Sequence, residues 1–164
     1  MILFHGTNTD IDKINLTIGQ KHKDFGQGFY LTPDKDTATR MAMKKSRLFG
    51  GAATVIAYDF DENLLNNSSF KILVFPEKAT AEWIKFISLN RDTKEQVNCH
   101  GLDIIKGPIA DDGVVLQLTN FRDQILTPEE AAKRMQDKFL DQQLCFCTEK
   151  AISVLKKIDS WKIH

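Results

Sequence analysis

The chain has 164 residues, of which 42% are hydrophobic and 27% are charged, as is usual for a globular protein. Its 22 basic and 22 acidic side chains cancel, which excludes a protein that attracts nucleic acid or membranes through its net charge. A chain of this length can bury well over half of its unfolded surface, so we expect one domain over residues 1–164.

The first half of the chain predicts alternating short strands and helices. Pro33 and Asp34 are typical of a helix start, and Gly50-Gly51 is typical of a helix end. Two runs rich in β-branched and aromatic residues, 53–60 and 70–76, flank a turn-forming segment, so we expect them to pair with each other. The predicted strands are residues 2–5, 28–31, 53–60 and 70–76, and the predicted helices are residues 34–49 and 79–90.

The second half predicts a similar alternation that ends in a helix. Thr127 and Pro128 are typical of an N-cap and a first helical position, and Thr148 is typical of the cap of a closing helix. Residues 111–121 fit either a strand or a helix. The predicted strands are residues 102–108 and 143–147, and the predicted helices are residues 127–139 and 148–158. The expected fold class is therefore α+β.

The sequence predicts neither a nucleotide-binding loop nor a metal site. Gly26-Gln27-Gly28 lacks the third glycine of a dinucleotide-binding turn and precedes its strand, where such a turn follows one. Cys99-His100 and Cys145-x-Cys147 offer four zinc-binding atoms, but neither half has the usual CxxC spacing. Cys145 and Cys147 are better explained as small side chains of a buried strand. We expect no metal.

The cysteines and the apolar segments predict a reduced, cytoplasmic protein. Cys99, Cys145 and Cys147 are an odd number without the spacing of a disulfide framework. No segment approaches the ~20 apolar residues of a transmembrane helix. Residues 1–4 lack the basic start and the long apolar run of a signal peptide. We therefore expect no association with a membrane.

Three segments follow an order that is found in one enzyme superfamily. They are "FHGT" at residues 4–7, "FGQGFYLTPDKDTA" at residues 25–38 and "QLCFCTEKAISVLKKI" at residues 143–158. They resemble the three motifs of the ADP-ribosyltransferase superfamily, on the branch of diphtheria toxin and the poly(ADP-ribose) polymerases, which carries a His-Tyr-Glu triad on separate strands. The chain is also similar to small bacterial proteins grouped with this superfamily, which share segments of the "DIIKGPIADD" type.

The resemblance implies an ADP-ribosyltransferase-like fold of split mixed β-sheets with flanking helices, and NAD as the substrate. Cleavage of the nicotinamide–ribose bond passes through an oxocarbenium-like state, as in glycoside hydrolysis. In this family pattern the backbone of Gly6 pairs with the nicotinamide amide, His5 bonds a ribose hydroxyl, and Tyr30 stacks on the nicotinamide ring. The residues implied in NAD binding are His5, Gly6, Thr7, Gly28, Tyr30 and Thr37.

The third triad position departs from the family pattern, because Gln143 stands where the family has a glutamate. Its amide can bond a ribose hydroxyl but cannot supply the negative charge that stabilises an oxocarbenium centre. A polymerase that elongates chains is therefore not expected. Asp141 and Glu149 are the nearest carboxylates that could replace the glutamate. By the same reasoning, Gln143→Glu is expected to raise nicotinamide release.

Each site residue also has a plain structural interpretation. Taken alone, His5 would be a core histidine, Tyr30 a core aromatic and Gln143 a strand-edge amide. Their joint match to the motifs favours a site with His5, Tyr30 and Gln143 as the catalytic residues. Phe25 and Phe29 are expected in the core, and His22 and Lys23 are expected on a solvated loop.

Three classes of function remain open. The first is an NAD-dependent mono-ADP-ribosyltransferase that modifies a protein, a nucleic acid or a small molecule, or an NAD glycohydrolase that uses water instead. The second is a module that binds NAD or ADP-ribose without turnover, and the third is a structural domain. Small bacterial proteins of this superfamily are often toxins with an antitoxin partner, which is an association by resemblance.

Overall fold

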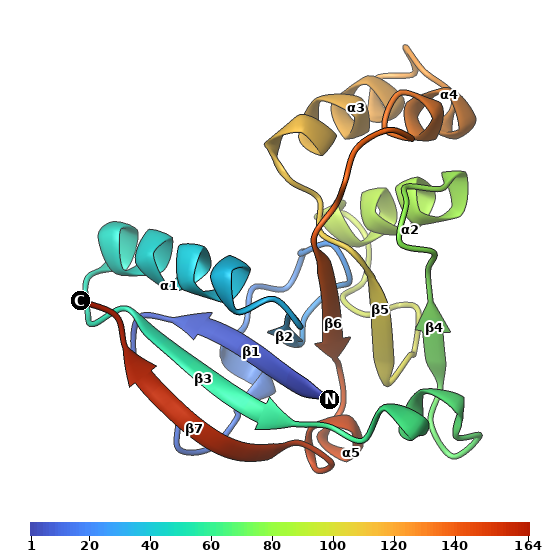
Figure 1. The fold of residues 1–164 in the computed structure, drawn as a ribbon. Helices are drawn as coiled ribbons and strands as arrows, with labels where there is room; N and C mark the ends of the chain where they lie inside the picture. The colour runs from blue at the N-terminus through green and yellow to red at the C-terminus, as the bar shows by residue number, and fades with distance from the viewer.

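Seven strands and five α-helices make up the structure, a computed structural model that describes residues 1–164 (Figure 1). The predicted α+β class is confirmed. The strands are β1 (Ile2–Thr7), β2 (Phe29–Leu31), β3 (Thr54–Asp59), β4 (Ile72–Val74), β5 (Ile104–Pro108), β6 (Gln142–Phe146) and β7 (Lys156–Lys162). The helices are α1 (Lys35–Phe49), α2 (Ala81–Arg91), α3 (Asp112–Arg122), α4 (Pro128–Lys133) and α5 (Glu149–Ile152), with 3₁₀ helices η1 (Leu16–Ile18) and η2 (Glu62–Asn66).

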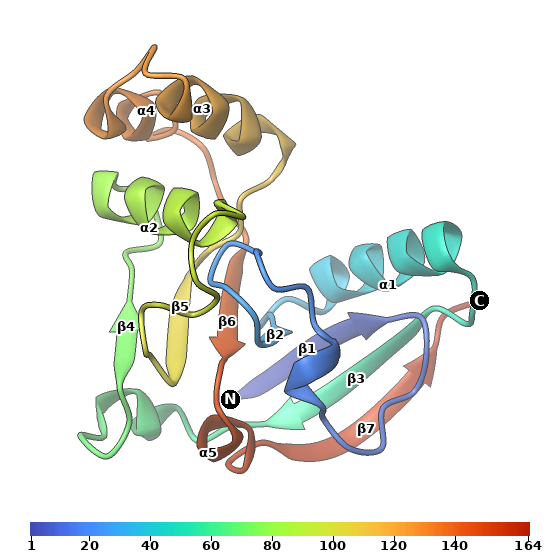
Figure 2. The ribbon, with the colours of Figure 1, turned by 180° about the vertical axis from the view of Figure 1, so that it is seen from behind.

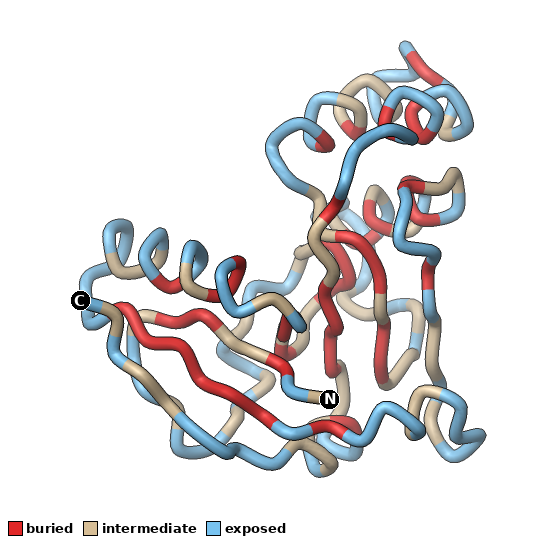
Figure 3. Tube along the Cα trace, in the orientation of Figure 1, coloured by how far each residue is buried: buried red, intermediate tan, exposed pale blue.

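The strands form two separate sheets. One is antiparallel with the order β1-β3-β7, and the other has the order β2-β6-β5-β4, in which β4 runs parallel to β5. Helix α1 lies over one face of the three-stranded sheet (Figure 1). The long connection from β1 to β2 crosses the other face, as the view from behind shows (Figure 2). This double cover explains why β3 is buried along Thr54–Tyr58 (Figure 3).

The two sheets meet at one isolated bridge between Phe4 and Thr32. The Phe4 N–H donates to the Thr32 carbonyl at 2.8 Å, and the Thr32 N–H donates to the Phe4 carbonyl at 2.9 Å. Beyond this pair, β1 and β2 diverge into different sheets. Backbone groups on this edge of β1 are therefore available to side chains or ligands.

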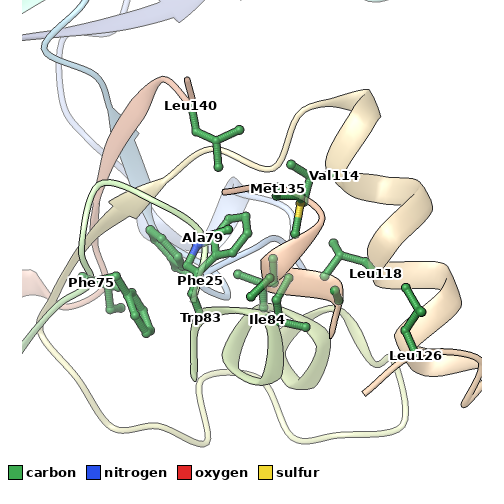
Figure 4. Close-up of a cluster of buried hydrophobic side chains, with 14 of the residues drawn as sticks. Phe25, Phe75, Ala79, Trp83, Ile84, Val114, Leu118, Leu126, Met135 and Leu140 are labelled. Carbon is green, nitrogen blue, oxygen red and sulfur yellow. The ribbon is translucent and has the colours of Figure 1, made fainter. Parts of the chain in front are cut away.

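Helices α2, α3 and α4 pack together at one end of the four-stranded sheet and enclose the largest apolar cluster (Figure 1). Trp83, Ile84 and Ile87 of α2 are fully buried, and Phe86 packs against the same cluster. Figure 4 shows α2 meeting α3 and α4 over Trp83 and Ile84. Phe25 and Phe29 are buried, as predicted, although they belong to two different clusters. The structure has no helix with the length and hydropathy required to cross a bilayer.

The predicted pairing of residues 53–60 with residues 70–76 is wrong. β3 is the central strand of one sheet, and β4 pairs with β5 in the other. The segment between them contains η2, which Asp61 caps by accepting a hydrogen bond from the Asn63 N–H at 3.0 Å. A capped helical turn carries the chain away from β3, whereas a hairpin would have returned it.

The predicted closing helix is also wrong beyond its first turn. Thr148 caps α5 as expected, but α5 ends at Ile152 and residues 156–162 form β7 on the outer edge of β3. The outer edge of β3 offers backbone hydrogen bonds to residues 156–162. A longer helix would have left these backbone groups of β3 without partners. Helix α4 likewise ends at Lys133, short of residue 139, and residues 112–122, which fitted either class, form α3.

Candidate functional site

A cleft opens where the two sheets meet, beside the first turns of α1. β1 contributes His5 and Gly6, β2 contributes Tyr30, α1 contributes Thr37, and β6 contributes Gln143. These predicted site residues come from four elements that are far apart in the sequence. The structure thus brings five of the predicted residues to one cavity.

His5 is held as a neutral imidazole with one free nitrogen. Its Nδ1 lies 2.7 Å from the Tyr30 carbonyl oxygen, and its ring stacks on Phe29 with 4.4 Å between centroids. Burial and the nearby Lys45 ammonium lower the pKa of His5 to about 3. Because a carbonyl only accepts, Nδ1 carries the proton and Nε2 is an acceptor. Nε2 is therefore suited to accept a hydrogen bond from a ligand hydroxyl.

Gly6 presents backbone groups to the cleft. Phe4 points its N–H and C=O away from β3, and the two-residue period of a strand gives Gly6 the same direction. The Gly6 carbonyl accepts a hydrogen bond from Lys45 Nζ at 2.8 Å. A Cβ at Gly6 would overlap the carbonyl oxygen of Ala38 and lie 2.8 Å from the Ala42 nitrogen. The glycine is therefore required by the close packing of α1 on β1.

Tyr30 is fixed at its hydroxyl end. The hydroxyl donates to the Gly26 carbonyl at 2.6 Å and accepts from the Phe25 N–H at 3.0 Å. Burial raises the pKa of Tyr30, so the phenol stays protonated. Gly26 has a φ of +85°, which suits glycine at this turn. The hydroxyl closes the turn and orients the ring toward the cleft.

Tyr30→Phe is expected to lower the free energy of unfolding by about 1–3 kcal/mol, because it leaves the buried Phe25 N–H and Gly26 carbonyl without their partner. Urea denaturation followed by fluorescence measures the change. The other tyrosine, Tyr58, forms no hydrogen bond through its hydroxyl, so Tyr58→Phe is the matched control and should cost less. Equal losses would show that the Tyr30 hydroxyl does not stabilise the turn.

Gln143 is buried, and its amide orientation follows from its two partners. Its Nε2 donates to Asp24 Oδ2 and to the Pro108 carbonyl, both at 3.2 Å. Both partners only accept, so the nitrogen must face them. Its Oε1 has no hydrogen-bond partner in the chain and remains available as an acceptor on the cleft side.

Asp24 holds Gln143 in this orientation and is itself held by a partly buried ion pair with Arg91. Arg91 donates from Nε and Nη2 to Asp24 Oδ1, at 2.7 and 2.6 Å. The Ala110 N–H and Gln143 Nε2 occupy Oδ2 at 3.3 and 3.2 Å. The sequence analysis did not identify Asp24 or Arg91. No local pattern connects them, because they lie in a loop and at the end of α2.

Two lysines enter the cleft, and one of them contradicts the sequence analysis. Lys23 was predicted on a solvated loop, but its Nζ lies over the Tyr30 ring, 4.0 Å from the centroid. Lys45 extends from α1, and its Nζ donates to the Gly6 carbonyl at 2.8 Å. Burial lowers the pKa of both side chains, that of Lys45 to about 8. The turn at Gly26 folds the loop back and brings Lys23 inward.

Other predicted residues lie beside the cleft. Thr7 is buried and accepts a hydrogen bond from the Thr9 N–H at 3.3 Å. Gly28 is packed against Cys145 and Phe146, where a Cβ would lie 2.8 Å from the Phe146 carbonyl oxygen. Neither residue lines the cleft. Their roles are therefore in the packing around the site.

The two carboxylates that could replace the family glutamate also lie outside the cleft lining. Asp141 lines a neighbouring groove, where its Oδ2 accepts from Thr37 at 2.8 Å and from Arg40 at 2.9 Å. Glu149 lies in the first turn of α5 and is exposed. Thr37 lines both spaces and connects them.

The cysteines show no metal-binding arrangement. Cys145 is buried on β6 with its Sγ 3.5 Å from that of Cys147, and Cys99 is exposed. No group of three or more His, Cys, Asp or Glu side chains in the structure is arranged to hold a metal ion.

The fold and the cleft define an α+β protein with a polar candidate site at the junction of two sheets. Residues 1–157 match the family described as "Protein of unknown function (DUF3990)", and the chain belongs to this family. No curated protein and no solved structure gives a significant match.

Proposed function

We propose that this protein is an NAD-dependent mono-ADP-ribosyltransferase with an ADP-ribosyltransferase-like fold of split sheets. It would cleave the nicotinamide–ribose bond of NAD and transfer ADP-ribose to a protein, a nucleic acid or a small molecule. One observation carries the proposal: His5, Tyr30 and Gln143, from three strands, line a single cleft together with Gly6.

The chemistry of the cleft residues is compatible with NAD. The unprotonated Nε2 of His5 and the Oε1 of Gln143 can each accept a hydrogen bond from a ribose hydroxyl. The cleft edge at Gly6 can present its N–H to a carboxamide oxygen. The Tyr30 ring offers a flat surface for nicotinamide once the Lys23 ammonium leaves its face.

The charge of the site limits the rate that we expect. No aspartate or glutamate lines the cleft, so among the lining side chains only the dipole of the Gln143 amide can stabilise the developing oxocarbenium charge, and Lys23 and Lys45 oppose it. This favours slow transfer of a single ADP-ribose unit, or hydrolysis by water, over chain elongation. The same observation favours a second candidate, a module that binds NAD or ADP-ribose without turnover. A role as a toxin with an antitoxin partner is a further proposal by resemblance.

NAD is expected to raise the melting temperature, because a ligand that binds only the folded state stabilises it. At about a hundred times the Kd the gain is about 2.7 kcal/mol, equivalent to about 5–10 °C for a chain of this size. Differential scanning fluorimetry measures the shift, and nicotinamide release measures turnover. Release above background supports the transferase or glycohydrolase, whereas a shift without release supports the binding module.

His5→Ala should remove the NAD-dependent shift, and the exposed His164→Ala is the matched control that should keep it. The absence of any shift in the wild-type protein at millimolar NAD would count against both candidates. A His5→Ala protein that binds NAD as tightly as the wild type would show that the cleft is not the NAD site.

A further inference from the structure

The cleft carries two positive charges that no acidic side chain balances. Lys23 and Lys45 both line it, whereas the lining contains no aspartate or glutamate and His5 is neutral. The charge of the adjacent Asp24 acts on Lys23, but the oxygens of Asp24 are occupied by Arg91, Gln143 and the Ala110 N–H. The ion pairs of the structure involve other residues. The cleft is thus a local concentration of positive charge in a chain of zero net charge.

Both ammonium groups also have unused hydrogen-bond donors. An ammonium carries three N–H donors. Lys45 donates one N–H to the Gly6 carbonyl. The ammonium group of Lys23 contacts only the face of the Tyr30 ring. Burial and the charge of Lys23 lower the pKa of Lys45, as is expected for two like charges that line one cleft. Such partly desolvated charges are stabilised when an anion lies between them.

We propose that the cleft binds a phosphoryl group between Lys23 and Lys45, and that its ligand is a phosphorylated nucleotide. The two charges match a phosphate or a diphosphate, whereas a single carboxylate would balance only one of them. The Tyr30 ring and the free acceptors of His5 and Gln143 lie on the same cleft and suit the base or sugar of such a ligand. The inference needs only a phosphoryl group and is independent of NAD cleavage.

Binding would also change the position of Lys23. A charge-assisted hydrogen bond to a phosphoryl oxygen is stronger than the contact of an ammonium with an aromatic face. The ligand therefore draws Lys23 Nζ from the Tyr30 ring and uncovers the ring for stacking. In this way the anion prepares the surface on which a flat group binds.

Isothermal titration calorimetry at low salt tests the proposal with inorganic pyrophosphate, ADP-ribose and NAD. We expect millimolar or tighter binding of pyrophosphate, and a loss of affinity of about tenfold or more in both Lys23→Met and Lys45→Met. Lys85→Met removes a charge from the exposed face of α2 and should bind as the wild type does. Without ligand, Lys23→Met should melt at or above the wild-type temperature, because it relieves the repulsion.

The outcomes separate this inference from the proposed function. Pyrophosphate and ADP-ribose binding that depends on both lysines, without nicotinamide release, would support the phosphoryl site and contradict the transferase. Nicotinamide release that persists in both lysine variants, with no pyrophosphate binding, would overturn the phosphoryl site and leave the transferase standing. Pyrophosphate binding that is unchanged in folded Lys23→Met and Lys45→Met would also overturn it.

Discussion

Gln143→Glu is expected to destabilise the fold by about 3–5 kcal/mol and to leave nicotinamide release at or below the wild-type rate. The hydrogen bonds of the Gln143 amide argue against the rise in nicotinamide release that the sequence predicts for this substitution. The Gln143 amide nitrogen faces Asp24 Oδ2 and the Pro108 carbonyl, at 3.2 Å each. A glutamate would place a carboxylate against two acceptors and lose both hydrogen bonds. Chemical denaturation and a nicotinamide assay measure the two effects.

The pH dependence of the stability of Gln143→Glu tests whether repulsion between the new carboxylate and Asp24 causes the loss. In the folded Gln143→Glu variant, burial beside Asp24 would raise the pKa of the introduced carboxyl group, because the charged form is disfavoured. A carboxyl group with a raised pKa in the folded state costs stability above that pKa, and the cost falls as the pH falls towards its unfolded value. The variant should therefore be closest to the wild type in acid. A constant difference from about pH 5 to about pH 8 would contradict like-charge repulsion as the cause.

A double variant provides the matched control. Asp24→Asn combined with Gln143→Glu restores one amide–carboxylate pair and keeps a single negative charge beside Arg91. We expect it to recover part of the lost stability and, if the transferase proposal is correct, to release more nicotinamide than the single variant. Wild-type stability in the single variant at about pH 8 would show that the amide of Gln143 is oriented the other way.

Gly6→Ala is expected to cost about 3 kcal/mol and to abolish ligand binding in the cleft. The new methyl group would overlap the Ala38 carbonyl oxygen and lie 2.8 Å from the Ala42 nitrogen, so α1 would have to move away from β1. Because α1 carries Thr37 and Lys45, this movement would widen the cleft and separate its polar groups. Denaturation measures the first effect, and titration with NAD or pyrophosphate measures the second.

Gly19→Ala is the control for Gly6→Ala. Gly19 has a φ of −69°, and the nearest atom to an added Cβ is at 3.4 Å, so alanine fits without strain. This variant should keep the wild-type stability and binding. If Gly6→Ala is as stable as Gly19→Ala, the packing of α1 on β1 does not require a glycine.

Helix starts could be predicted from the sequence because their chemistry is local. Asp34 accepts hydrogen bonds from the Asp36 and Thr37 N–H groups, and Thr127 forms a capping box with Glu130. Strand partners could not be predicted, because β3 pairs with the first and the last strands of the chain. The residues of a strand do not indicate which distant segment of the chain will be its partner.

The candidate site was predictable only in part. The resemblance selected His5, Tyr30 and Gln143, and the structure places all three on one cleft. It gave no indication of the Asp24–Arg91 pair that holds Gln143, since these residues are 67 positions apart and belong to no motif. Lys23 was missed because a loop lysine is usually solvated, and only the folded turn at Gly26 brings it over the Tyr30 ring.

The position of β6 between β2 and β5 has a consequence for the synthesis of the protein. Gln143 belongs to β6, which pairs with both β2 and β5. The four-stranded sheet therefore cannot form until β6 has left the ribosome. The β1 segment with His5 and the β2 segment with Tyr30 are synthesised early, but β2 can pair only after β6 has been made. The central strand β3 gains its second partner later still, when β7 has been made. A nascent chain that has not yet reached β6 therefore carries His5 and Tyr30 without a complete cleft, and any activity of the site begins only after β6 has been synthesised.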